Sequence, residues 1–140
     1  MAEMTDAERD DFLAERRVAV LAIERVDKGP LCAPVWYRRD ENGRFQVAMA
    51  DDSAKARLLR ATGCATLCVQ QESRPYQYVT VEGPVELHVL SAAERVEALS
   101  LIAARYLGVD GAKAYVENFP DHDEALVTLT PRRWRTEVLL

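Results

Sequence analysis

Short, mostly apolar segments separated by polar turns run along most of the chain, a pattern typical of antiparallel β-sheet. Residues 31–39 alternate most clearly, and one face of that segment holds Leu31, Ala33, Val35 and Tyr37. The opposite face holds Cys32, Pro34, Trp36 and Arg38. The pattern predicts strands over residues 18–26, 31–39, 44–50, 65–71, 76–90, 124–131 and 132–140.

Turn residues show how these strands connect. Asn42 and Gly43 suit the positive φ of a tight hairpin, so residues 18–50 are expected to form a three-stranded antiparallel meander. Gly83 and Pro84 interrupt the long segment 76–90, and because proline cannot donate to a strand ladder they predict a bulge or a barrel corner.

Capping residues predict the helices. Thr5 with Glu8, and Ser91 with Glu94, have the spacing of capping boxes, and Ser53 is a suitable N-cap. Phe12 and Leu13 of the first helix are expected to face inward. The predicted helices run from Thr5 to about Arg16, from Ser53 to about Gly63, from Ser91 to about Leu107 before Gly108, and over about Gly111–Asn118.

Six or seven short strands, mostly sequential and with inserted helices, favour an antiparallel barrel with helices on its rim. A doubly wound parallel sheet would need a helix after nearly every strand, and the pattern does not provide them. We expect one domain over residues 1–140.

Charge and composition narrow the class of protein. The net charge of −5 argues against nucleic acid and against anionic membranes as partners. No apolar run approaches the roughly 20 residues of a membrane span, and the acidic N-terminus lacks the apolar region of a signal peptide. Three cysteines are too few for a disulfide framework, so we expect a cytoplasmic protein.

Motifs for side-chain catalysis are missing. The chain has neither standard nucleotide loop and no GxSxG elbow. His88 is interpreted as a surface or structural residue and His122 as a solvated loop residue. Cys64 and Cys68 are interpreted as small buried core residues rather than metal ligands. We therefore assign no catalytic side chain and no metal site.

The helix from Ser53 has an unusual charge pattern. Lys55 and Arg57 fall near its N-terminus, where the helix dipole disfavours cations, and residues 53–71 contain no acidic side chain. An anion bound at this helix end would explain both cations. Alternatively, the cations form a solvated face paired with Asp51 and Asp52.

Neighbouring residues could bind a planar molecule. Pro34 marks a strand position without a ladder bond, where a planar ligand could approach the backbone. Trp36 and Met49 could supply apolar, polarisable contact, although Trp36 taken alone is better interpreted as a core anchor.

Residues 28–87 resemble the split β-barrel flavoproteins related to pyridoxamine 5′-phosphate oxidase, and especially their actinobacterial flavin- and deazaflavin-dependent oxidoreductases. The similarity is carried by PVWY at 34–37, SAKARLLR at 53–60, and LCV with RPYQYVTVEG at 67–83. It implies a six-stranded antiparallel split β-barrel with peripheral helices. It also implies a homodimer with two cofactors in the grooves between its subunits.

The resemblance also implies a set of cofactor-binding residues. Ser53 and Lys55 match positions that hold the cofactor phosphate, with Arg57 close by. Tyr78 matches a strand that often completes the groove. The strand along the isoalloxazine corresponds to Pro34, Val35 and Trp36, and the strand behind the ribityl chain to Met49 and Ala50.

Two departures bear on the cofactor. The pyridoxamine phosphate oxidases have arginines at the positions of Ala33 and Ala54, so an FMN site of that type would lose two charge-assisted contacts. The resemblance therefore favours the deazaflavin coenzyme F420 over FMN. Its polyglutamate tail could meet Arg38, Arg39 or Arg60.

The resulting hypothesis is an oxidoreductase that transfers a hydride between coenzyme F420 or FMN and a small molecule, since the cofactor carries the chemistry in such proteins. The alternative is a non-catalytic flavin, haem or lipid carrier on the same barrel. A third interpretation is a structural dimeric barrel without a cofactor.

Overall fold

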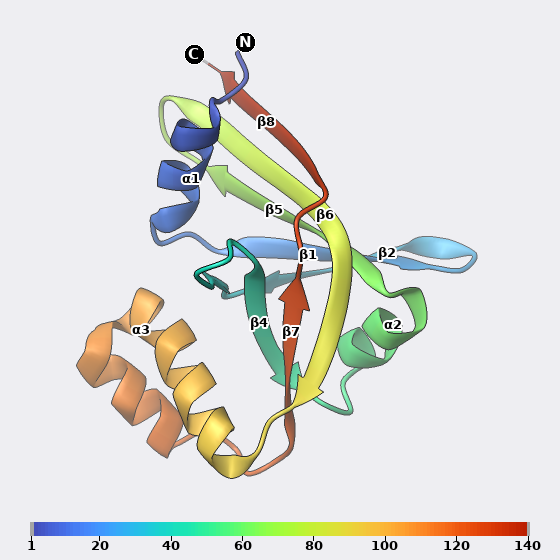
Figure 1. The fold of residues 1–140 in the computed structure, drawn as a ribbon, viewed down its shortest axis with the longest axis vertical. Helices are drawn as coiled ribbons and strands as arrows, with labels where there is room; N and C mark the ends of the chain where they lie inside the picture. The colour runs from blue at the N-terminus through green and yellow to red at the C-terminus, as the bar shows by residue number, and fades with distance from the viewer. Residues whose placement is uncertain (1, 140) are drawn as a thin grey trace.

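A computed structural model describes residues 2–139 (Figure 1). The three helices are α1 (Asp6–Ala14), α2 (Ala54–Thr62) and α3 (Ala92–Glu117). The strands are β1 (Ala19–Arg25), β2 (Lys28–Val35), β3 (Arg38–Arg39), β4 (Phe45–Ala50), β5 (Cys64–Gln71), β6 (Tyr76–Val89), β7 (Glu124–Leu129) and β8 (Arg133–Leu139). In this part of the chain, no helix is long and apolar enough to cross a bilayer.

All strand pairs are antiparallel, in the order β2-β1-β5-β6-β7-β4-β3, with β8 also pairing with β6. The sheet is not closed, and its arrangement is that of a split barrel, as predicted. The two chain ends lie together beside β8 (Figure 1), where Ala2 pairs with Val138.

The long strand β6 belongs to both halves of the sheet. Its first half pairs with β5 and β8, and its second half pairs with β7. The predicted corner lies at Gly83, although the strand continues through it without a break. A Cβ atom on Gly83 would stand 1.8 Å from the carbonyl oxygen of Thr130. Glycine is therefore required because two backbones meet at this corner.

The predicted strand over residues 31–39 was only partly right. It divides at Trp36 and Tyr37 into β2, which pairs with β1, and the short β3, which pairs with β4. The other edge of β4 pairs with β7, so the expected meander does not continue as one ladder. The division has a tertiary cause, because the Tyr37 amide donates to the Tyr106 hydroxyl of α3 at 3.0 Å.

The helix signals are confirmed. Both capping boxes form, and Gly63 ends α2 in the left-handed region at φ 72°. The first helix is shorter than expected, ending at Ala14. Gly108 interrupts α3 with φ 74° and ψ 173°, so that α3 consists of two helical segments, as the glycine had indicated.

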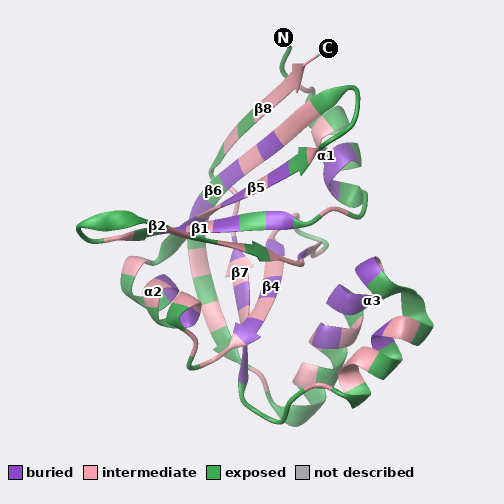
Figure 2. Cartoon of the chain, turned by 180° about the vertical axis from the view of Figure 1, so that it is seen from behind, coloured by how far each residue is buried: buried purple, intermediate pink, exposed green. Residues whose placement is uncertain are grey.

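The core lies between the sheet, α1 and α2, and Figure 2 shows its buried positions along the strands. Phe12 and Leu13 are buried there, as predicted. The interpretation of Cys64 and Cys68 as buried core residues was wrong, because Cys64 is exposed and Cys68 is only partly buried. On β5 the alternate residues face the core, and these are Ala65, Leu67 and Val69.

Candidate functional site

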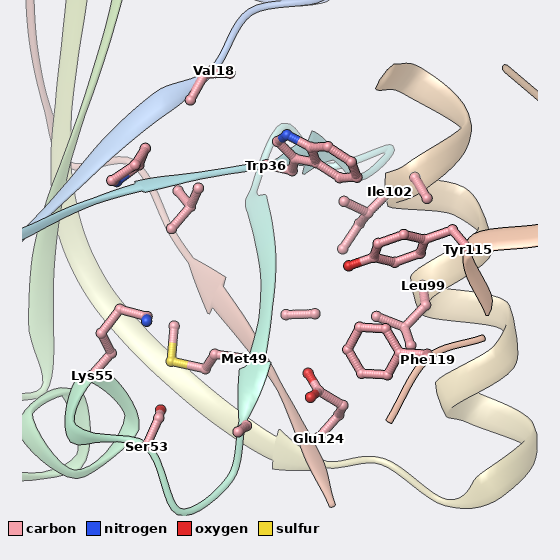
Figure 3. Close-up of a pocket in the computed structure, with 15 residues that line it drawn as sticks. Val18, Trp36, Met49, Ser53, Lys55, Leu99, Ile102, Tyr115, Phe119 and Glu124 are labelled. Carbon is pink, nitrogen blue, oxygen red and sulfur yellow. The ribbon is translucent and has the colours of Figure 1, made fainter. Parts of the chain in front are cut away.

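A cavity of about 530 Å³ lies between the barrel and α3 (Figure 3). One wall comes from the end of β2, from β4 with the adjoining first residue of β7, and from the start of α2, and the other comes from α3 and Phe119 just after it. The chain connects α3 to the barrel at both of its ends, and the cavity lies between these two parts of one fold.

Most of the predicted cofactor residues meet on the barrel side of this cavity. β2 ends at its rim, β4 runs along it, and α2 begins beside it (Figure 3). The predicted residues that line it are Pro34, Val35, Trp36, Met49, Ala50, Ser53 and Lys55. The fold thus brings β2, β4 and α2, which a hairpin and a turn separate in the sequence, to one surface.

Two predicted residues do not line the cavity. Arg57 is exposed, and its guanidinium donates to the backbone carbonyl of Asp52. Tyr78 lies on β6 opposite Glu137 of β8, with Arg135 nearby. A hydrogen bond to Glu137 raises the pKa of the Tyr78 phenol. A role for either residue in the cavity of this protomer has no support in the geometry.

The cations of α2 separate into two groups. Arg60 forms an ion pair with Asp51, and Arg57 is held by Asp52, as the solvated-face interpretation expects. Lys55 forms no ion pair among residues 2–139, and Figure 3 shows its amino group directed into the cavity. The anion-site interpretation therefore applies to Lys55 alone of these three cations.

The start of α2 presents donor groups to the cavity. Ser53 adopts an extended conformation, and its hydroxyl accepts from the Ala56 amide at 3.1 Å. The hydroxyl proton remains available for donation to a ligand. The first turn contains no acidic side chain, so the positive end of the helix dipole is not neutralised from within.

The α3 side of the cavity, and Glu124 at the start of β7, were missed in the sequence. Most of these residues lie on α3, and apolar spacing along a helix does not distinguish a face that covers a cavity from one that packs in a core. The missed lining residues include Leu99, Ile102, Ala103, Tyr115, Phe119 and Glu124.

Glu124 is the one acidic residue among those that line the cavity. It begins β7 and is 2% exposed, and its Oε1 atom lies 2.5 Å from Nε2 of His122. Burial raises the pKa of the Glu124 carboxyl, and the hydrogen bond to His122 opposes this effect. His122 is an exposed loop residue, as interpreted from the sequence, and its ring is in addition a partner of a buried carboxylate.

The other candidate ligands lie outside the cavity. His88 is exposed and its Nε2 contacts Oε2 of Glu94 at 3.0 Å. Arg38 and Arg39 line a separate hollow, where Arg39 pairs with Asp10 at 3.0 Å. Among the described residues, no cluster of His, Cys, Asp and Glu side chains could hold a metal ion.

The fold and the sequence now identify the class of protein. The pyridoxamine 5′-phosphate oxidase family model matches residues 5–137, and the chain belongs to this family. No curated protein matches the sequence.

Solved structures share the fold. The conserved hypothetical protein Rv2991 from Mycobacterium tuberculosis is 24% identical, with a TM-score of 0.79 over 96% of this chain and 85% of that one. An F420 reductase is 18% identical, with a TM-score of 0.67 over 90% and 94% of the two chains. HutZ, the heme storage protein from Vibrio cholerae, is 15% identical, with a TM-score of 0.68 over 95% and 93%. At these identities the similarity establishes the fold, which hosts several functions.

Proposed function

We propose that this protein is an oxidoreductase that transfers a hydride between coenzyme F420 or FMN and a small molecule. The observation that supports this most is the cavity itself, which joins apolar and aromatic walls to the N-terminus of α2. Such a site suits a planar ring system that carries a phosphate. When bound, the cofactor would supply the carbon that carries the hydride.

The residues present fit the phosphate of such a cofactor. Lys55 is directed into the cavity without an ion-pair partner among the described residues, and Ser53 retains a hydroxyl proton to donate. Trp36 and Met49 would contact the ring system from the barrel side. Leu99 and Ile102 of α3 would exclude water from the opposite side, which strengthens polar interactions within the cavity.

Coenzyme F420 is the cofactor that we favour. The positions at which the pyridoxamine phosphate oxidases have arginines are Ala33 and Ala54 here. Arg57 and Arg60 are the nearest substitutes on α2, and each is already held by a neighbouring aspartate residue. A second phosphate-binding cation of that type is therefore not supplied by α2.

A homodimer is also part of the proposal. Val18 and Val20 are 50% and 41% exposed, and Val18 lies at the cavity's rim. In the ladder, Val20 stands opposite Pro34 and Cys68, so an apolar sheet face adjoins the site. A second copy on this face would close the cavity. Sedimentation of Val20→Glu as a monomer, against a dimeric parent chain, would support this arrangement, and a monomeric parent chain would contradict it.

Equilibrium dialysis against equimolar F420 and FMN tests the proposed function. Preferential retention of F420 supports it and leads to a substrate screen with the reduced cofactor. Preferential retention of FMN would mean that Ala33 and Ala54 are compensated elsewhere, and would overturn the F420 preference. Retention of neither would reject the proposal. It would leave the structural barrel or a haem or lipid carrier, although no histidine or cysteine is among the residues that line the cavity.

A further inference from the structure

Glu124 occupies a position where a carboxylate is costly. Its side chain is 3% exposed, and it projects from the barrel side into the cavity beside Phe119 (Figure 3). Two backbone contacts fix its place at the start of β7: it pairs with Ala50, and its carbonyl accepts from the Leu90 amide at 2.9 Å. A buried charge without full pairing is strongly unfavourable, so a functional role for this side chain should be considered.

One of the two carboxylate oxygens is available to a ligand. Oε1 contacts Nε2 of His122 at 2.5 Å, whereas Oε2 has no hydrogen-bond donor within residues 2–139. The walls near Glu124 include Leu99, Phe119 and Tyr115, and of these only the tyrosine carries a polar group. A molecule that enters the cavity can therefore meet Oε2.

His122 connects this buried carboxylate with solvent. The His122 side chain is 38% exposed, in contrast to the 3% of Glu124. The imidazole packs at 5.5 Å from the ring of Phe119, and the His122 carbonyl accepts from Arg95 at 3.0 Å. The ring is thus held with one edge on the carboxylate while part of it reaches water, which is the arrangement of a proton relay.

We propose that Glu124 is a proton-transferring catalytic residue and that His122 exchanges its proton with solvent. This inference rests on the proposed function, and it names the substrate class as compounds with a polarised double bond that take up both a hydride and a proton. When bound, the reduced cofactor would supply the hydride. As the hydride bonds to one end of the conjugated acceptor, the π electron pair moves to the heteroatom X at its other end, and X takes the proton from Oε2. The Glu124 carboxylate then regains a proton through His122 from water.

The charged and titratable surroundings agree with this role. Burial raises the pKa of Glu124, so its carboxyl retains a proton at higher pH than an exposed glutamate, while His122 and Arg95 oppose the shift. Tyr115 from α3 faces the same carboxyl, and its pKa is raised by burial and by Glu124. A carboxyl with a raised pKa is a more effective proton donor near neutral pH.

The first test needs no turnover. In protein labelled with ¹³C at glutamate carboxyls, one resonance that is absent from Glu124→Gln should titrate above the others. In His122→Ala, which removes both the hydrogen bond and the charge that oppose this rise, the same resonance should move to still higher pH. Titration of Glu124 together with the exposed glutamates would overturn the proposal.

The second test compares two hydride acceptors on the cofactor-loaded protein. Menadione takes up a hydride and a proton, whereas 10-methylacridinium takes up a hydride only. Glu124→Gln should lower kcat for menadione about 100-fold or more and leave 10-methylacridinium reduction within about threefold. The exposed neighbour variant Asp123→Asn should change neither rate, and His122→Asn should lower the menadione rate and shift its pH profile.

Separate outcomes distinguish the two proposals. Equal loss with both acceptors, or loss with neither, would overturn the proton role while the oxidoreductase proposal stands. Cofactor retention without reduction of either acceptor by the parent chain would overturn the oxidoreductase proposal, and the proton role with it.

Discussion

The indole of Trp36 lies face to face with the phenol ring of Tyr106, with ring centroids 4.7 Å apart and planes 5° from parallel. Tyr115 approaches the same indole at 5.6 Å between centroids. Tyr106 precedes Gly108 in α3 and Tyr115 follows it, so Trp36 holds both helical segments against the end of β2. The two interpretations of Trp36, as ligand contact and as anchor, therefore describe one side chain that lines the cavity and anchors its far wall.

Trp36→Ala should destabilise the fold and weaken cofactor binding together. Loss of the stacked contacts is expected to cost about 2–4 kcal/mol of unfolding free energy, since truncation of packed aromatic residues has this effect. Urea unfolding and a cofactor titration would measure the two changes. Trp36→Phe retains an aromatic ring, so its stability and its cofactor affinity should lie between those of Trp36→Ala and of the parent. An alanine variant as stable as the parent would show that the stack does not hold α3.

Lys55→Ala should weaken cofactor binding with little loss of stability. Lys55 is only partly buried and has no ion-pair partner among residues 2–139, so its removal leaves no protein charge uncompensated. Loss of a charge-assisted bond of about 1.5–3 kcal/mol corresponds to a 10- to 100-fold weaker affinity. Arg57→Ala is the matched control on the same helix and should have a small effect. Equal effects of the two variants would contradict the phosphate role of Lys55.

Gly83→Ala should damage the corner where β6 passes between the two halves of the sheet. The added Cβ would stand 1.8 Å from the Thr130 carbonyl oxygen, a backbone atom that cannot yield without displacing the β7–β8 connection. We expect a loss of about 3 kcal/mol or more in unfolding free energy. Gly29→Ala has nothing within 4 Å of the added atom and serves as the control. Comparable thermal stability of the two variants would refute this account.

Tyr37 should make stability fall at high pH. Its buried hydroxyl donates to the Leu13 carbonyl at 2.9 Å, and burial raises its pKa to about 12 although Arg105 opposes the shift. The folded state thus holds this proton more tightly than the unfolded state, so the stability contribution is full below about pH 10 and is lost as the pH rises through 12.

Tyr37→Phe should flatten that alkaline decline while costing about 1–3 kcal/mol at neutral pH, because the Leu13 carbonyl loses its donor. Urea unfolding at a series of pH values would measure both effects. Tyr76, which is 45% exposed, provides the control variant Tyr76→Phe. An undiminished alkaline decline in Tyr37→Phe would assign the effect to other groups.

Features that depend on neighbouring residues could be predicted from the sequence. Ser53 and Gly63 delimit α2, and the Thr5 and Ser91 capping boxes begin α1 and α3, because each signal acts within one helical turn. Gly83 indicated the corner because a glycine inside a strand marks a bend or a close approach of two backbones, and this follows from the residue type alone. Together with the family resemblance, this local order sufficed to place most of the predicted cofactor residues on the cavity that the structure contains.

The tertiary structure alone decided what depends on partners far along the chain. Tyr37 leaves the strand ladder for a hydroxyl 69 residues away, which no periodicity in residues 31–39 indicates. Cys64 and Cys68 follow the solvent-facing side of β5, a choice of face set by which side of the sheet is covered. Glu124 lines the cavity only because α3 is folded back onto the barrel. The sequence shows a glutamate at this position but not whether its carboxylate is buried. Local chemistry sets the elements, whereas burial and proximity arise only when the elements pack.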